Sequence, residues 1–217
     1  MDNPGARLHI PESFLEHRQF FSNPWVERWV VPNPFISALV LPLRAVGVEL
    51  SDLSFNKDAA NIGDLYLNIS IRRLNAAVRI GLDTVTFIAA NPDWGIAPQL
   101  VAVFDQISGQ IHNVVEVSPK SQEATLAFHV SPGTEDFGKI TASLVNGNVV
   151  GECLFCGISL YRSDGALVID KSLRYEGAAF VRLQRRFAGD ALLADVAAQL
   201  YEDEAAALRL LGITEVL

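Results

Sequence analysis

Residues 64–73 alternate between apolar and polar side chains, the pattern of a β-strand with one buried face. The apolar members of this face are Leu65, Leu67, Ile69 and Ile71. Val78, Ile80 and Leu82 continue in period two, but Val85 and Phe87 follow one residue out of phase. A β-bulge within one strand explains this slip, and so does a tight turn near Asp83.

Two segments have the helical period instead. The first carries Pro98 in its first turn, and its apolar stripe is Leu100, Val103, Phe104, Ile107 and Ile111. The second begins after Gly189-Asp190 and ends at Gly212, and its stripe is Leu193, Val196, Ala197, Leu200, Leu208 and Leu211. Each stripe predicts a helix that covers one face of a sheet.

Strong turn signals divide the region between the two helices. The predicted strands are 124–130, 139–145, 149–162 and 166–174, separated by the loop 131–138, by Asn146-Gly147-Asn148 and by Ser163-Asp164-Gly165. This spacing predicts an antiparallel meander. Residues 175–187 fit both a strand and a helix, and we favour a change from strand to helix near Gly177.

The first 50 residues are rich in aromatic side chains. We expect a short amphipathic helix from Glu12 to Asn23-Pro24, then a helical turn over 25–31. An extended segment over 35–50 is expected next, with Pro42 at an edge or a bend. A polar connection over 51–63 follows.

Together these elements predict an α+β fold of about seven strands in one or more antiparallel sheets, with helices packed on one face. The order suggests two similar strand-then-helix lobes, 35–111 and 114–217, within a single domain 35–217. We expect residues 1–34 to form an aromatic-rich segment that packs on that domain.

Composition narrows the function classes. Apolar residues make up 50% of the 217 and charged residues 19%, enough for a real core and a surplus for a cavity or an oligomer interface, most simply that of a homodimer. A net charge of −8 argues against nucleic-acid binding. No apolar run reaches the roughly 20 residues of a membrane helix. With two cysteines and no signal sequence, we expect a cytoplasmic protein without a membrane span.

Motifs for catalysis or metal binding are weak. Cys153 and Cys156 form a C-x-x-C pair, but inside a predicted strand they point to opposite faces and have no partner ligands. The four histidines are dispersed, and no nucleophile or nucleotide motif occurs. We therefore predict no metal and no cofactor, and the sequence leans away from an enzyme.

Two groups of residues are candidates for ligand or partner contact. Arg182, Arg185 and Arg186, which Arg174 could join, form a basic cluster. It could hold an anion, or it could pair with the acidic last helix or with another subunit. Trp25, Trp29 and Trp94 could line a binding surface or pack in a core.

The leading hypothesis is a non-catalytic binding or accessory protein whose apolar groove or cavity holds a protein segment or a small apolar ligand. One alternative is an enzyme that acts on a small anionic substrate held by Arg182, Arg185 and Arg186. Another is a structural homo-oligomer, which predicts that Trp25 and Trp29 are buried only at a subunit contact.

Overall fold

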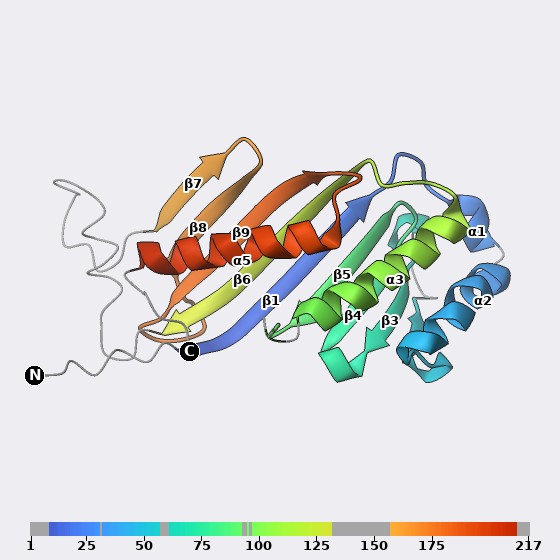
Figure 1. Ribbon diagram of the computed structural model, residues 1–217, viewed down its shortest axis with the longest axis horizontal. Helices are drawn as coiled ribbons and strands as arrows, with labels where there is room; N and C mark the ends of the chain where they lie inside the picture. Colours follow the sequence, from blue (N-terminus) through green and yellow to red (C-terminus); the bar gives the residue numbers. More distant parts are fainter. Residues whose placement is uncertain are drawn as a thin grey trace, which may run out of the picture. The chain divides into compact units, whose positions relative to one another are not determined.

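The computed structural model of the protein describes residues 9–30, 32–56, 61–92, 95, 97–131 and 157–211. The α-helices in these ranges are α1 (Val26–Val30), α2 (Pro32–Leu43), α3 (Ala97–Val115) and α5 (Leu193–Leu210) (Figure 1). Short 3-10 helices span Arg44–Val46, Leu50–Asp52, Ile62–Asp64 and Arg72–Leu74. The strands are β1 (His9–Phe20), β2 (Leu53–Phe55), β3 (Leu67–Ile71), β4 (Ala76–Ile80), β5 (Thr84–Ala90), β6 (Ser121–Ser131), β7 (Ile158–Arg162), β8 (Gly165–Lys171) and β9 (Ala179–Ala188).

The described strands form one antiparallel sheet in the order β2-β3-β4-β5-β1-β6-β9-β8-β7. The predicted α+β class and antiparallel sheet are therefore confirmed. The predicted number of about seven strands was too low, because the described part of the sheet has nine. The two predicted strand-then-helix lobes are not seen in the described residues. The two strands that the sequence did not reveal, β1 and β2, come from segments without a readable apolar period.

The chain divides into two compact units. Unit 1 comprises the described residues within Met1–Phe14, Thr125–Arg185 and Gln199–Leu217, and unit 2 those within Leu15–Ala124 and Arg186–Ala198. β1, β6, β9 and α5 contribute residues to both.

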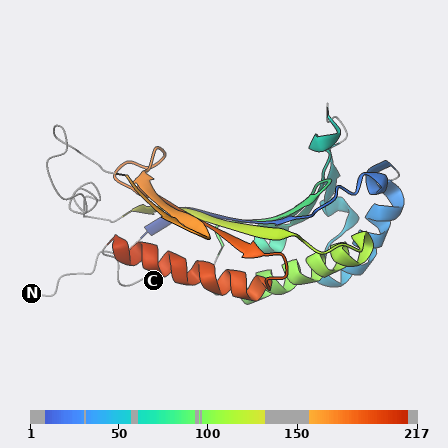
Figure 2. The ribbon, with the colours of Figure 1, turned by 90° about the horizontal axis from the view of Figure 1, so that it is seen from above.

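Helix α3 lies along one face of the sheet at strands β3–β5 (Figure 2). The hydrophobic core of unit 2 is formed by their buried side chains together with those of α1 and α2. Every residue of the predicted α3 stripe is buried, as are Val78, Ile80, Val85 and Phe87 on the strands. The change of phase between β4 and β5 is a turn, since the amide of Gly81 donates to the carbonyl of Thr84 at 2.8 Å and Ile80 pairs with Val85. The turn interpretation is confirmed, and a bulge is excluded here.

Unit 1 contains the meander strands β7, β8 and most of β9, paired antiparallel in register. Ala179, Val181 and Leu183 are buried on one face of β9, so the strand reading of 175–187 is right from Ala179 onward. The predicted change to a helix near Gly177 is wrong. Gly177 has φ +70° and sits in the β8–β9 connection, where the left-handed conformation suits glycine.

Two predictions for the N-terminal region are also wrong. Residues 12–20 form part of β1 rather than a helix, because the inward positions Leu15, His17 and Gln19 alternate, and two of these are polar and conceal the period. The segment expected to be extended is mainly helix α2. Phe35, Leu39 and Leu43 are buried at helical spacing, and Pro42 lies in the last turn.

Several predicted features lie outside the described residues. They are the strand 139–145, the turn at Asn146-Gly147, the pair Cys153 and Cys156, Trp94, and the helix end at Gly212.

Candidate functional site

Arg185 is held by ion pairs with two aspartates of unit 1. Its guanidinium donates from Nε and one amino group to both carboxylate oxygens of Asp203 on α5, the second at 2.8 Å. The other amino group lies 2.6 Å from Asp164, in the turn between β7 and β8. Hydrogen bonding to Asp203, together with the charges of both aspartates, raises the pKa of Arg185 despite its burial. Arg162 joins the same network, 3.3 Å from Asp164 and 3.6 Å from Asp203.

Arg182 and Arg186 point away from this network. Both are exposed, whereas Arg185, between them on β9, is buried on the other face. Arg186 lies 3.7 Å from Glu123. The three arginines do not converge, and the contacts of Arg185 match the predicted alternative of pairing with the acidic run of the last helix.

Trp25 and Trp29 are buried within unit 2, each 5% exposed. The ring of Trp25 lies 4.7 Å from that of Phe21, and the ring of Trp29 lies 5.5 Å from that of Phe55. Their indole nitrogens have no hydrogen-bond partner among the described residues. The expectation that these tryptophans become buried only at a subunit contact is wrong, since the chain buries them itself.

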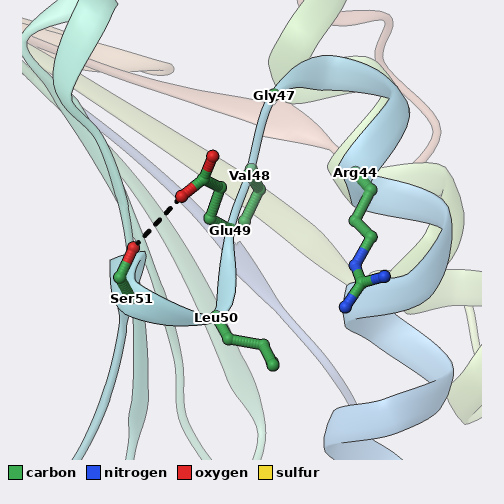
Figure 3. Close-up of a pocket in the computed structure, with 6 residues that line it drawn as sticks. All are labelled: Arg44, Gly47, Val48, Glu49, Leu50 and Ser51. Atoms are coloured by element: carbon green, nitrogen blue, oxygen red, sulfur yellow. Dashed lines mark hydrogen bonds between the residues drawn. The ribbon is translucent and has the colours of Figure 1, made fainter.

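One pocket of about 520 Å³ lies beside the loop 47–51 in unit 2. Figure 3 shows Arg44 and Leu50 extending toward the same gap, while the carboxylate of Glu49 turns toward Ser51, whose hydroxyl lies 3.5 Å away. Leu50 is 62% exposed. This pocket places one exposed cation beside a short loop.

A second pocket of about 520 Å³ lies in unit 1 and is a better candidate. Its lining comes from β6, the end of β8, the β8–β9 connection and β9, through His129, Asp170, Lys171, Leu173, Arg174 and Phe180. Its volume falls within the usual range for small-molecule sites, and its exposed surface is mostly apolar by area, although four of its six lining residues are polar or charged. Asp170 pairs directly with Phe180, so both side chains lie on the same face of the strands.

Ser172 fixes His129 at the edge of this pocket. The buried Ser172 hydroxyl oxygen accepts hydrogen bonds from the backbone amides of Arg174 at 3.1 Å and Tyr175 at 2.9 Å. It also lies 3.0 Å from Nδ1 of His129. A hydroxyl has two acceptor sites and one proton, so the proton is donated to Nδ1. This contact requires the His129 tautomer that carries its proton on Nε2.

Packing holds the same elements in place. The His129 ring lies between Tyr175, with ring centres 5.1 Å apart, and Phe180, at 5.2 Å. Arg174 is 2.6 Å from Glu12 of β1, and the Tyr175 hydroxyl is 3.4 Å from the same carboxylate. The β8–β9 connection is therefore attached to β1 as well as to β6, and the pocket walls are preorganised.

This site was hard to predict from the sequence. The alternation of β6 could have placed His129 on the face opposite the buried Phe128 and Val130. Nothing in the linear order joins it to Ser172 or Phe180, which reach it only through the pairing of β8 with β9.

Unit 2 holds a separate buried polar cluster. Nε2 of His17 lies 2.8 Å from the Gln122 amide oxygen, and the Gln122 amide nitrogen donates to the carbonyls of Gly189 and Ala191 at 2.8 and 2.9 Å. Burial lowers the pKa of His17 to about 4, and the Gln122 hydrogen bond opposes that shift. We interpret this cluster as structural, since it satisfies backbone groups inside the fold.

No protein-family model and no curated protein matches this sequence. Among the described residues, no group of three or more His, Cys, Asp or Glu side chains is placed to hold a metal ion. In the same part of the chain, each helix is too short or too polar to cross a membrane.

Proposed function

We propose that this chain is a non-catalytic binding protein that holds a small ligand with an apolar body in the pocket beside Phe180 and His129. The supporting observation is the pocket of about 520 Å³, whose exposed surface is mostly apolar by area and to which polar or charged residues also contribute. Leu173 lines the pocket, and its side chain is 100% exposed. An apolar ligand bound against it would remove this apolar surface from water.

The hydrogen bonding of Ser172 favours binding over catalysis. A serine next to a histidine resembles a nucleophile with its base. Here, however, two backbone amides occupy the acceptor sites of the hydroxyl, and the residue is 4% exposed. Attack on a substrate needs a free lone pair and room to approach, and Ser172 offers neither in this arrangement.

The enzyme alternative also required an anion held by the three arginines. Arg185 is already paired with Asp203 and Asp164, which leaves the exposed Arg182 and Arg186 on the surface. We therefore base the proposal on the pocket rather than on the arginine cluster.

Calorimetric titration with octan-1-ol, a neutral apolar probe, tests the proposal. We expect saturable binding, weakened about tenfold in Phe180→Ala because part of the apolar contact is lost. Phe14→Ala is the matched control, since Phe14 is a 39% exposed aromatic of unit 1 that does not line the pocket. Absence of saturable binding, or equal loss in both variants, would overturn the proposal. Native mass spectrometry of freshly purified protein adds a direct search for a retained ligand.

A further inference from the structure

Strand register decides which side chains face the pocket beside Phe180. Asp170 of β8 pairs directly with Phe180 of β9, and the next pair along is Lys171 with Ala179. Ala179 is fully buried on the opposite face of β9, so the side chain of Lys171 points away from the face that carries Asp170 and Phe180. The charged side chains left at the pocket are those of Asp170 and Arg174.

These two charges are compensated differently. Arg174 donates to Glu12 at 2.7 Å, so a carboxylate outside the lining already neutralises its guanidinium. The Asp170 carboxylate accepts the backbone amide of Lys171 through Oδ1 at 2.7 Å, and no ion pair joins it to a cation of the described residues. Asp170 therefore supplies one uncompensated negative charge to the pocket.

Gly157 leaves the room in which this carboxylate lies. Ile158 of β7 pairs with Ile169 of β8, which brings Gly157 opposite Asp170. A Cβ atom on Gly157 would lie 3.2 Å from Oδ1 and 3.6 Å from Oδ2 of Asp170. The carboxylate is thus placed over Gly157 with Oδ1 engaged by a backbone amide, and the lone pairs of Oδ2 are left for a ligand.

One further cation lies on the same face but outside the pocket. Arg182 follows Phe180 by two residues and pairs in register with Val168. It is exposed and does not line the pocket. Solvent and salt screen its charge, so it weakens the field of Asp170 at the lining less than a group in direct contact would.

The head groups that a ligand can carry differ in how they meet Asp170. An anionic head group would face this carboxylate with only the already paired Arg174 to offset the repulsion. An alcohol can donate one hydrogen bond between an uncharged donor and the carboxylate. A protonated amine donates to Oδ2 and also neutralises the charge, and hydrogen bonds between two ionised groups are the stronger ones.

We infer that the ligand of this pocket is a protonated primary amine with an apolar body, and that Asp170 is the residue that selects the ammonium group. The inference rests on the proposed binding function and adds the class of head group. The ammonium lies at Asp170, and the apolar body lies against Phe180 and Leu173.

Three probes with the same eight-carbon chain test this assignment: octan-1-amine, octan-1-ol and octanoate. Calorimetric titration at pH 7.5 and low salt should rank the amine first, about threefold above the alcohol, and octanoate last. The expected preference is modest because Asp170 is exposed. Equal binding of amine and alcohol overturns the head-group assignment but leaves the binding function standing, as does tightest binding of octanoate. Binding of none of the three overturns both.

The variant Asp170→Asn isolates the charge, since asparagine keeps Oδ1 as the acceptor of the Lys171 amide. It should lower the affinity for octan-1-amine about threefold, to that for octan-1-ol, and leave octan-1-ol binding unchanged. Asp190→Asn is the matched control, because it removes an exposed aspartate that does not line the pocket.

This control is needed because a chain with a net charge of −8 attracts any cation. An equal loss of octan-1-amine binding in Asp190→Asn and Asp170→Asn would show such a general effect and contradict the assignment. Unchanged octan-1-amine binding in Asp170→Asn would contradict it as well.

Discussion

The Nε2 atom of His17 lies 2.8 Å from the amide oxygen of Gln122, although the two residues are 105 positions apart in the chain. Both side chains are buried, 3% and 2% exposed, and the imidazole stacks on Phe87 with ring centres 5.7 Å apart. The Gln122 oxygen can only accept, so Nε2 carries the proton, and the buried Nδ1 atom has no partner among the described residues. A neutral imidazole is thus built into the core of unit 2.

This neutral imidazole makes stability depend on pH. The pKa of His17 is about 4 in the folded chain and 6.5 when unfolded, so the unfolded state binds the proton more readily. The contribution of the neutral His17 to the free energy of unfolding is fully present above pH 6.5. It is lost as the pH falls toward 4, and the total loss is about 3 kcal/mol. Urea unfolding at pH 7.5, 6, 5 and 4.5 measures this loss.

His17→Gln removes the titrating group and keeps an N–H donor near Gln122. We expect this variant to show a weaker pH dependence of the free energy of unfolding between pH 7.5 and 4.5 than the parent protein. His112→Gln is the comparison, since burial also lowers the pKa of the half-buried His112, and it should flatten the profile less. An unchanged profile in His17→Gln would show that the acid sensitivity arises elsewhere.

Gln122 should be a sensitive position for stability. Gln122→Leu leaves the His17 N–H and the carbonyls of Gly189 and Ala191 without their partner. Buried polar groups left unsatisfied are costly, so we expect a loss of about 2–4 kcal/mol in the free energy of unfolding. Gln184→Leu, at a half-buried position of β9, is the control and should change stability by less than about 1 kcal/mol. Comparable losses in the two variants would contradict this role for Gln122.

The same cluster explains which parts of the fold the sequence revealed. Strands β3–β5 and helix α3 were predictable because apolar side chains occupy almost every inward position, for example Val78, Phe87 and Ile107. β1 was not, because its inward positions include His17 and Gln19, whose hydrogen-bond partners lie far along the chain. A local pattern cannot show that a polar side chain is satisfied by a distant partner.

The candidate site was hidden for a related reason. The arginines were visible as a charge cluster, but strand alternation separates Arg185 from Arg182 and Arg186. The pocket residues are individually ordinary. His129, Ser172 and Phe180 come together through strand pairing and through the turn at Gly177, which period and composition do not encode.

Arg185 should matter for folding rather than for binding. Arg185→Met leaves Asp203 and Asp164 with only the more distant and more exposed Arg162 as a cation, and we expect a loss of about 2 kcal/mol in the free energy of unfolding because Asp164 is partly exposed. Arg182→Met, at an exposed position of the same strand, should lie within about 0.5 kcal/mol of the parent protein. Thermal and urea unfolding measure both. A loss of octan-1-ol binding in a stably folded Arg185→Met would instead contradict a purely structural role for Arg185.

Ser172 offers a direct test of binding against catalysis. Ser172→Ala removes the acceptor of two backbone amides and the hydroxyl that orients His129. We therefore expect the free energy of unfolding to fall by about 1–2 kcal/mol and octan-1-ol to bind more weakly. Ser172→Thr keeps the hydroxyl and should retain most of both properties. If Ser172 were a nucleophile, hydrolysis of p-nitrophenyl octanoate by the parent protein would exceed the background rate and would vanish in Ser172→Ala. We expect no such activity in either protein, with the difference between them confined to stability and binding.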